Sequence, residues 1–191
     1  MTTRKGLTQQ AVVTAAAAVV DADGPDALTV TRVARELGVR PPSLYSHVAS
    51  LDGLRRGVAL AAIAGLGDVL GAAAMGRAGG EALRALSAAF REYAGQHPGL
   101  YELTTAARPD DAEFAAASLG AAAPVLAVLA GCGLVGADAI HAARTLRSAL
   151  HGFVSLENVG GFGLDVDVDA SFEWLVTGLV SAITAAPESL R

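Results

Sequence analysis

The sequence predicts an all-α protein, and three observations lead to this prediction. Alanine, the residue with the highest helix propensity, occupies 42 of the 191 positions, whereas aromatic residues, which favour strands, make up 5%. Apolar residues recur at three- and four-residue spacing along most of the chain, which is the spacing of one helical face. The composition, 52% hydrophobic and 17% charged, supports a folded core rather than disorder.

Two apolar stretches resemble export or membrane signals, but their flanks argue against both. Residues 11–20 form an apolar decamer behind Arg4 and Lys5, yet acidic residues occupy the expected cleavage region. Residues 114–137 carry no charge, but they are rich in Ala and Gly and lack flanking Lys or Arg, so we expect a buried helix of a soluble protein. The single cysteine, Cys132, cannot form an internal disulfide. We therefore expect a cytoplasmic protein without membrane association.

The first two helices are delimited by clear start and stop residues. A helix is expected from Leu7 to the stop at residues 24 and 25, with one face of small apolar residues. That face consists of Ala11, Ala15, Ala18, Val19 and Ala22. Thr29 is expected to cap a second helix over residues 30–37, which ends at Gly38 because glycine readily adopts the left-handed conformation of a helix exit.

A third, short helix and a fourth, longer one are expected next. The third runs through residues 43–47, since Pro41 and Pro42 fit a first helical turn, where amide donors are not needed. The fourth begins at Leu51, with Ser50 as its cap, and fades within residues 76–80.

The remainder of the chain is also expected to be helical, because its apolar residues keep the helical spacing. An amphipathic helix covers 81–95, a turn covers 97–99, and further helices cover 100–107, 110–131 with a kink near Pro124, 137–159 and 168–186. The last helix is apolar on more than one face. We therefore expect a homodimer that forms through the last two helices.

The N-terminal quarter carries a candidate nucleic-acid-binding motif. Residues 1–56 contain seven Lys and Arg against five Asp and Glu, whereas the rest contains seven against fourteen. Within this quarter, residues 28–48 (LTVTRVARELGVRPPSLYSHV) predict two short helices joined by a glycine turn, which is a helix-turn-helix. The apolar wedge between the helices is Val33, Leu37, Val39 and Leu44. The polar side chains expected to point outward, beside a helix N-terminus that suits a phosphate, are Arg40, Ser43, Tyr45 and His47.

The TVTRVARELGV run followed by SLYSHV resembles the TetR family of bacterial transcriptional regulators, over roughly residues 5–65. The HGFVSLE stretch at 151–157 is similar to the C-terminal signature of the WHG subgroup of that family. The resemblance implies a helix-turn-helix DNA-binding domain over residues 1–50 and a helical sensor and dimerisation domain over residues 51–191. It also implies that a small-molecule ligand changes the angle or separation of two DNA-binding heads on a palindromic operator.

We assign DNA contact to nine residues of the motif and the following helix. They are Thr29, Thr31, Arg40, Pro41, Pro42, Ser43, Tyr45, His47 and Arg55. By the family pattern, Tyr45 and His47 are similar to residues that grip phosphates, while residues 40–43 occupy the base-facing edge of the recognition helix. The alternative for Tyr45 and His47 is a structural role, packing the third helix against the first.

One position departs from the family pattern. Members commonly carry a Lys at the start of the fourth helix to hold the DNA backbone, whereas this chain has Leu51 and Asp52. Arg55 and Arg56 are the candidates to replace that contact.

Candidate ligand-binding residues lie beyond the motif. A pocket enclosed by residues 51–131 is expected, because many inward positions are Ala and Gly, which are too small to fill the space between long helices. The residues expected to line it are Phe90, Tyr93, His97, Tyr101 and Phe114, all of which are equally expected as core residues. A second set shares one polar stripe of a helix and consists of Arg144, Arg147 and His151. Three alternative roles are expected for this stripe: anchoring an anionic ligand, facing solvent, or lying at the rim of a dimer interface.

No residue pattern for catalysis, a cofactor or a metal is found in the sequence. The four histidines show no paired-ligand spacing, and there is no nucleophile elbow or glycine-rich nucleotide fingerprint. We therefore interpret the chain as a non-enzymatic, ligand-responsive repressor that binds double-stranded operator DNA as a homodimer. The alternative interpretation is a helical interaction protein, or a degenerate enzyme, in which the N-terminal motif only packs three helices.

Overall fold

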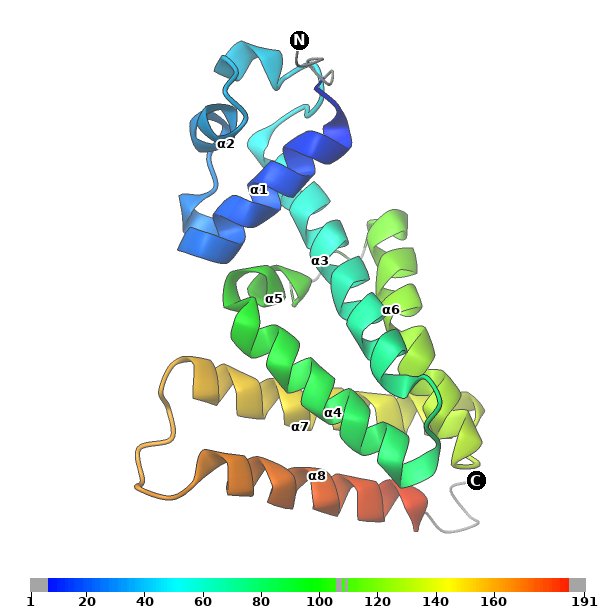
Figure 1. Cartoon of the computed structure of the whole chain (residues 1–191). Helices are drawn as coiled ribbons and strands as arrows, with labels where there is room; N and C mark the ends of the chain where they lie inside the picture. The colour runs from blue at the N-terminus through cyan, green and yellow to red at the C-terminus, as the bar shows by residue number, and fades with distance from the viewer. Residues whose placement is uncertain (1–6, 106–107, 109, 186–191) are drawn as a thin grey trace. The chain divides into compact units, whose positions relative to one another are not determined.

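The computed structural model describes residues 7–105, 108 and 110–185, which form eight α-helices and two short 3-10 helices without a strand (Figure 1). The predicted all-α class is thereby confirmed. The chain divides into two compact units, one of residues 1–64 and 97–115 and the other of residues 65–96 and 116–191. Helix α3 (Leu51–Ala74) contributes residues to both units. The boundary between the units therefore differs from the division into residues 1–50 and 51–191 that the family resemblance implied.

The first unit is built around helix α1 (Gln9–Asp23), whose inner face differs from the predicted one. The Oγ1 atom of Thr8 caps the helix by accepting a hydrogen bond from the Ala11 amide at 3.1 Å. The buried side chains are Val12, Val13, Ala16, Val19 and Val20. The predicted inner face was wrong except at Val19, because the branched valines bury more apolar area than alanine methyl groups and take the inward side.

Helix α2 (Val30–Glu36) follows the 3-10 turn η1 (Pro25–Ala27) and forms as predicted. Thr29 caps it, since its Oγ1 atom accepts a hydrogen bond from the Arg32 amide at 3.1 Å. The chain leaves the helix through Gly38, whose φ of +64° lies in the left-handed region that favours glycine. Val33 and Leu44 of the predicted wedge are fully buried, and Leu37 and Val39 pack half-buried against the same core.

Helix α5 (Pro98–Thr104) begins where a turn was predicted. The helix starts directly at Pro98, whose fixed φ suits a first helical position, and His97 precedes it. Residues 106 and 107, the predicted end of this helix, lie outside the described residues. Glycine at position 99 lets α5 approach α1 closely, because a Cβ there would overlap the carbonyl oxygen of Val20.

The second unit packs helix α4 (Gly79–Gln96) against helices α7 (Gly136–Asn158) and α8 (Val168–Thr184). Helices α7 and α8 lie side by side and run in opposite directions (Figure 1). The rings of Phe153 and Phe172 join them at a centroid distance of 5.2 Å, edge to face. These helices lie within a residue or two of the predicted ranges, although position 186 falls outside the described residues.

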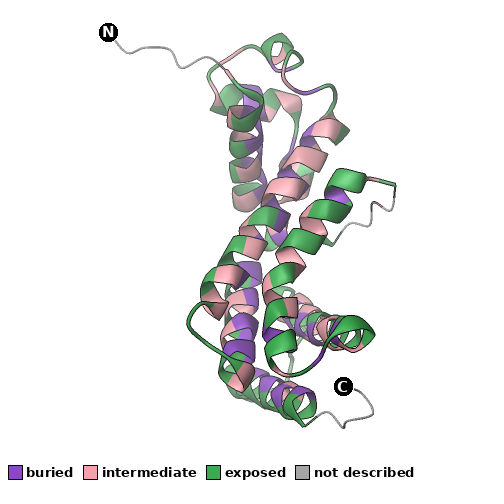
Figure 2. Ribbon diagram, turned by 90° about the vertical axis from the view of Figure 1, so that its right-hand side faces the viewer, coloured by how far each residue is buried: buried purple, intermediate pink, exposed green. Residues whose placement is uncertain are grey.

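Helix α6 (Ala112–Gly131) is not the buried helix that its uncharged sequence predicted. Phe114, Val128 and Leu129 are buried, but most of its residues are exposed or half-buried (Figure 2). The many alanines explain this result, since they favour the helix without needing to bury a large side chain. Helices α3 and α6 are long and apolar enough to cross a membrane by length and composition alone. The kink predicted near Pro124 stays a prediction.

Candidate nucleic-acid interface

The segment after α2 turns tightly and is anchored from beneath by a buried leucine. The amide of Gly38 donates to the Arg35 carbonyl at 3.1 Å, and the amide of Val39 donates to the Ala34 carbonyl at 3.0 Å, which closes the end of α2. The following residues form the 3-10 turn η2 (Pro41–Ser43), after which Leu44 is completely buried. The polar residues on either side of Leu44 are therefore held at the surface.

The predicted third helix is shorter than expected. Pro41 and Pro42 have no amide hydrogen, and η2 is closed by the Leu44 amide donating to the Pro41 carbonyl at 3.0 Å. A single further turn follows, in which the amides of His47 and Val48 both donate to the Leu44 carbonyl. This segment is thus a 3-10 helix continued by turns, rather than an α-helix through residues 43–47.

Most of the predicted DNA-contacting residues are accessible to solvent. Tyr45 is 57% exposed, so it does not pack as a core residue, whereas His47 is half-buried. Arg40, Pro42, Ser43, Thr29 and Thr31 are exposed, and Pro41 and Arg55 are half-buried. The Thr29 hydroxyl oxygen already caps α2, which leaves its hydrogen available as a donor.

The arginines of this unit divide into paired and unpaired groups. Arg32 pairs with Asp23 at 2.7 Å and with Glu36 at 3.0 Å. The guanidinium groups of Arg40 and Arg55 form no ion pair or hydrogen bond with any described residue. Arg40 and Arg55, which are assigned to DNA contact, thus keep an unneutralised charge, and so does the exposed Arg35, which is not assigned to it.

Arg56 is not available to replace the family's lysine. Its guanidinium donates two hydrogen bonds to Asp111 and another, of 2.7 Å, to Glu113. These bonds raise the pKa of Arg56 and hold its charge against two carboxylates. Of the two candidates, Arg55 alone keeps an uncommitted guanidinium.

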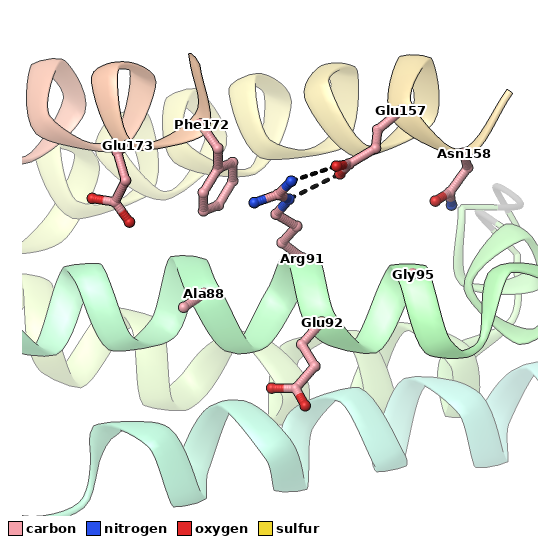
Figure 3. Close-up of a pocket in the computed structure, with 8 residues that line it drawn as sticks. All are labelled: Ala88, Arg91, Glu92, Gly95, Glu157, Asn158, Phe172 and Glu173. Atoms are coloured by element: carbon pink, nitrogen blue, oxygen red, sulfur yellow. Dashed lines mark hydrogen bonds and ion pairs between the residues drawn. The ribbon is translucent and has the colours of Figure 1, made fainter. Parts of the chain in front are cut away.

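The second unit contains a polar cluster that the sequence did not indicate. Arg91 extends from α4 toward Glu157 of α7, and the Phe172 ring of α8 lies beside its guanidinium (Figure 3). Arg91 makes two hydrogen bonds to Glu157 and pairs with Asp169 at 2.7 Å. The Glu157 hydrogen bond is the main cause of a raised Arg91 pKa, and the guanidinium lies 4.7 Å from the Phe172 ring centre.

A surface pocket of about 420 Å³ surrounds this cluster. It is lined by Ala88, Arg91, Glu92, Gly95, Glu157, Asn158, Phe172 and Glu173 (Figure 3). None of these residues was predicted, because the residues that meet here are up to 85 positions apart and no local spacing connects them. Within the described residues, no group of His, Cys, Asp and Glu side chains is placed to hold a metal ion.

The predicted ligand-binding residues are distributed over both units. Phe90 and Tyr93 belong to the second unit, whereas His97, Tyr101 and Phe114 belong to the first. The Nδ1 atom of His97 lies 2.9 Å from the Asp21 carboxylate, and the four aromatic residues are buried. In the second set, Arg144 and Arg147 are exposed and His151 is half-buried, and none of the three lines the pocket around Arg91.

Sequence comparison places the second half of the chain in a described domain family. Residues 83–179 match the family described as "Tetracyclin repressor-like, C-terminal domain". This range includes the HGFVSLE stretch, although the match does not address the WHG subgroup.

Two curated proteins are similar over nearly the whole chain. The uncharacterised HTH-type transcriptional regulator Rv0681 of Mycobacterium tuberculosis is 42% identical over 93% of this chain and 82% of its own length. The HTH-type transcriptional regulator YobS of Bacillus subtilis is 31% identical over 96% of each chain. Both matches include the candidate interface as well as the C-terminal helices.

A solved structure shares the fold. A TetR variant of Acinetobacter baumannii, in complex with minocycline, superimposes with a TM-score of 0.70 at 22% identity, covering 93% of this chain and 96% of that one.

Proposed function

The chain belongs to the TetR family of transcriptional regulators, and from this premise we propose that it is a repressor whose operator affinity is controlled by a small molecule. As a member of this family it is a DNA-binding regulator and not an enzyme. We further propose that residues 1–50 bind DNA, that residues 51–191 sense the ligand and dimerise, and that the protein acts in the cytoplasm.

The observation that carries the DNA-binding proposal is the exposed surface on either side of the buried Leu44. Arg40, Ser43 and Tyr45 present a guanidinium and two hydroxyl groups to solvent while Leu44 holds the backbone against the core. Arginine reads a guanine edge in the major groove, whereas hydroxyl groups commonly contact phosphate. Arg55, which is half-buried on α3, adds a second guanidinium that has no partner among the described residues.

The proposal of a ligand rests on the fold. The Acinetobacter protein with the same fold was solved with minocycline, a small molecule. We propose that the aromatic residues Phe90, Tyr93, Tyr101 and Phe114, together with His97, contribute to ligand binding here, and that Arg144, Arg147 and His151 are the alternative anchors for an anionic one. A ligand that binds the DNA-free geometry more tightly, by about 1–3 kcal/mol, would shift the population and release the operator.

The proposal of a homodimer rests on the outer side of α8. Trp174 is 83% exposed, and its neighbours on that side of the helix carry no charge. They are Ala170, Ser171, Gly178, Ser181, Ala182 and Ala185, whereas Thr177 at the edge of this side accepts a hydrogen bond from Arg84 of α4 at 3.0 Å. An exposed tryptophan on an uncharged helix face is typical of a protein interface. Trp174→Arg should therefore weaken the dimer, as measured by sedimentation. A charge at Leu179 would test the interface less directly, because Leu179 is half-buried within its own chain.

A DNA titration tests the proposed function. The intact chain is titrated, at two salt concentrations, into a fluorescent duplex from the region upstream of its own gene and into a shuffled duplex of the same length. A specific regulator should bind the first duplex at least about a thousandfold more tightly, and salt should weaken the binding of both. Equal, weak binding of every duplex from its genome would contradict DNA reading, and the motif would then only pack three helices.

A further inference from the structure

The first turn of α3 carries an acidic side chain beside a residue assigned to DNA contact. Asp52 is exposed over 77% of its side chain, and it lies on the same side of the helix as Arg55, three positions further. This turn follows the candidate interface closely, because Ser50, whose Oγ atom accepts a hydrogen bond from the Gly53 amide at 3.0 Å, is only two residues beyond Val48. An unneutralised carboxylate at this place would repel DNA phosphates.

Arg108, which lies between α5 and α6, supplies a positive charge to this carboxylate. Its Nη2 atom lies 3.4 Å from the Oδ1 atom of Asp52, although 56 positions separate the two residues. The Arg108 side chain is 27% exposed, and its Nε atom is buried without a hydrogen-bond partner among the described residues. Within the described part of the chain, the guanidinium therefore makes one long hydrogen bond, which leaves further N–H groups of its terminal nitrogens for an external acceptor.

Two contacts with α3 show that Arg108 lies toward the start of this helix. Asp111 bonds to Arg56 at 2.7 Å, whereas Arg108 bonds to Asp52, one helical turn earlier. Between Asp111 and Arg108, the point of contact thus moves about 6 Å along α3 toward Leu51. All of these residues belong to the first unit, which also contains the candidate interface. Arg108 is therefore the member of this ionic network that comes nearest to the candidate interface along α3.

The other carboxylates near Arg108 in the sequence do not neutralise it. Asp111 and Glu113 are both paired with Arg56. Asp110 is exposed and forms no ion pair with Arg108 or any other described residue. Since Asp52 and Arg55 carry opposite charges, the first turns of α3 would present no excess of positive charge to DNA without Arg108.

We propose that Arg108 contacts a DNA phosphate beside the start of α3, so that a residue from between α5 and α6 belongs to the DNA-binding surface. This inference rests on the DNA binding proposed above, and it adds a contact from outside residues 1–50. A guanidinium suits this role, because its planar donors match the oxygens of a phosphate group. Its donors point along two edges, so Arg108 can keep its bond to Asp52 while another N–H group binds the phosphate.

Salt-dependent DNA titrations of full-length variants test this contact, with the duplex that the wild type binds specifically. Arg108→Gln removes the charge but keeps a hydrogen-bond donor for Asp52. It should lower the affinity about tenfold at low salt and reduce the slope of log affinity against log salt by about 0.9. Arg108→Ala, prepared in parallel, should show the same slope, and Arg108→Lys should retain the wild-type slope. Arg77→Ala removes an exposed positive charge from the second unit and should leave the slope unchanged.

An Asp52→Asn background separates a phosphate contact from a role that only neutralises Asp52. If Arg108 contacts phosphate, Arg108→Gln should reduce the slope by about 0.9 in this background too. If Arg108 only neutralises Asp52, its substitution should have no effect once the carboxylate is absent. Melting curves confirm that each variant is folded. An unchanged slope in either background overturns this inference and leaves the DNA-binding proposal intact, whereas a wild type that prefers no duplex overturns both.

Discussion

Arg56 and Asp111 form a two-point ion pair although 55 positions separate them in the sequence, with Nη2 2.7 Å from one carboxylate oxygen and Nε bonded to the other. Asp111 also accepts a hydrogen bond from the Phe114 amide at 3.0 Å, so it caps the start of α6. One carboxylate thus joins the first turns of α3 to the first turn of α6. This pairing lowers the pKa of Asp111 from 3.8 to about 2, with the Arg56 hydrogen bond as the largest cause.

Asp111→Asn should make the melting temperature of the protein depend less on pH below about pH 4. Because the folded-state pKa of Asp111 is depressed, its stabilising effect is complete above about pH 4 and is lost as the pH falls toward 2. The melting temperature of the wild type should therefore fall more steeply between pH 4 and pH 2 than that of the variant. Calorimetric scans across this range measure the difference. Asp110→Asn, at the neighbouring exposed position, should keep the wild-type slope; parallel curves for wild type and Asp111→Asn would contradict the assignment.

Arg55 and Arg56 should differ in their effect on the salt dependence of DNA binding. Arg55 has an uncommitted guanidinium, so Arg55→Ala should reduce the slope of log affinity against log salt by about 0.9, the value of one phosphate contact. Arg56→Ala should leave that slope unchanged, because Asp111 and Glu113 already hold its charge. Fluorescence anisotropy titrations from low to moderate salt measure the slope for each variant. An unchanged slope for Arg55→Ala would remove Arg55 from the interface.

Substitutions at Arg40 and Tyr45 should distinguish a contact to DNA base edges from a contact to the DNA backbone. Arg40→Ala should lower the discrimination between the operator and a mismatched duplex by about 1–3 kcal/mol if the guanidinium reads a guanine edge. Tyr45→Phe removes one hydroxyl group and should weaken specific and shuffled duplexes by the same factor. Competition titrations against both duplexes provide the ratio. An Arg40→Ala variant that loses affinity uniformly would instead place Arg40 on a phosphate.

Gly67→Ala and Gly120→Ala should change stability in opposite directions, although both lie within helices. A Cβ at Gly67 would come within 2.9 Å of the Ala121 Cα atom, so the helices must separate, at an expected cost of about 1–3 kcal/mol. A Cβ at Gly120 meets no atom within 4 Å, and alanine there should stabilise the protein by about 0.5–1 kcal/mol. Urea unfolding curves compare the two variants with the wild type. Equal midpoints would show that α3 and α6 do not pack this tightly.

The features that the sequence predicted correctly depend on neighbouring residues. The Thr29 cap and the Gly38 exit each involve groups within five positions, so their chemistry is visible in a short segment. The inner face of α1 was wrong because Ala and Val are both apolar, and only packing decides which stripe turns inward. The pairs of Arg56 with Asp111 and of Arg91 with Glu157 depend on tertiary structure, which no spacing rule contains.

The sequence predicted which side chains are exposed at the candidate interface, but it did not predict the backbone conformation that carries them. The exposure of Arg40 and Tyr45 agrees with the outward positions expected for them, whereas their roles in DNA binding stay predictions. The two prolines were interpreted as the start of an α-helix, yet they precede a 3-10 turn and a single further turn. Proline fits the first turn of both kinds of helix, so this choice could not be made from the sequence alone.

The contact between Gly99 and the Val20 carbonyl has a consequence for how this protein can evolve. Any side chain at position 99 would push α5 away from α1, and no substitution at Val20 relieves the overlap, because the obstructing atom belongs to the backbone. Homologues that retain this helix crossing should therefore carry glycine at the equivalent position, whatever operator or effector they have come to recognise. A lineage that lost this glycine would have had to rebuild the crossing first.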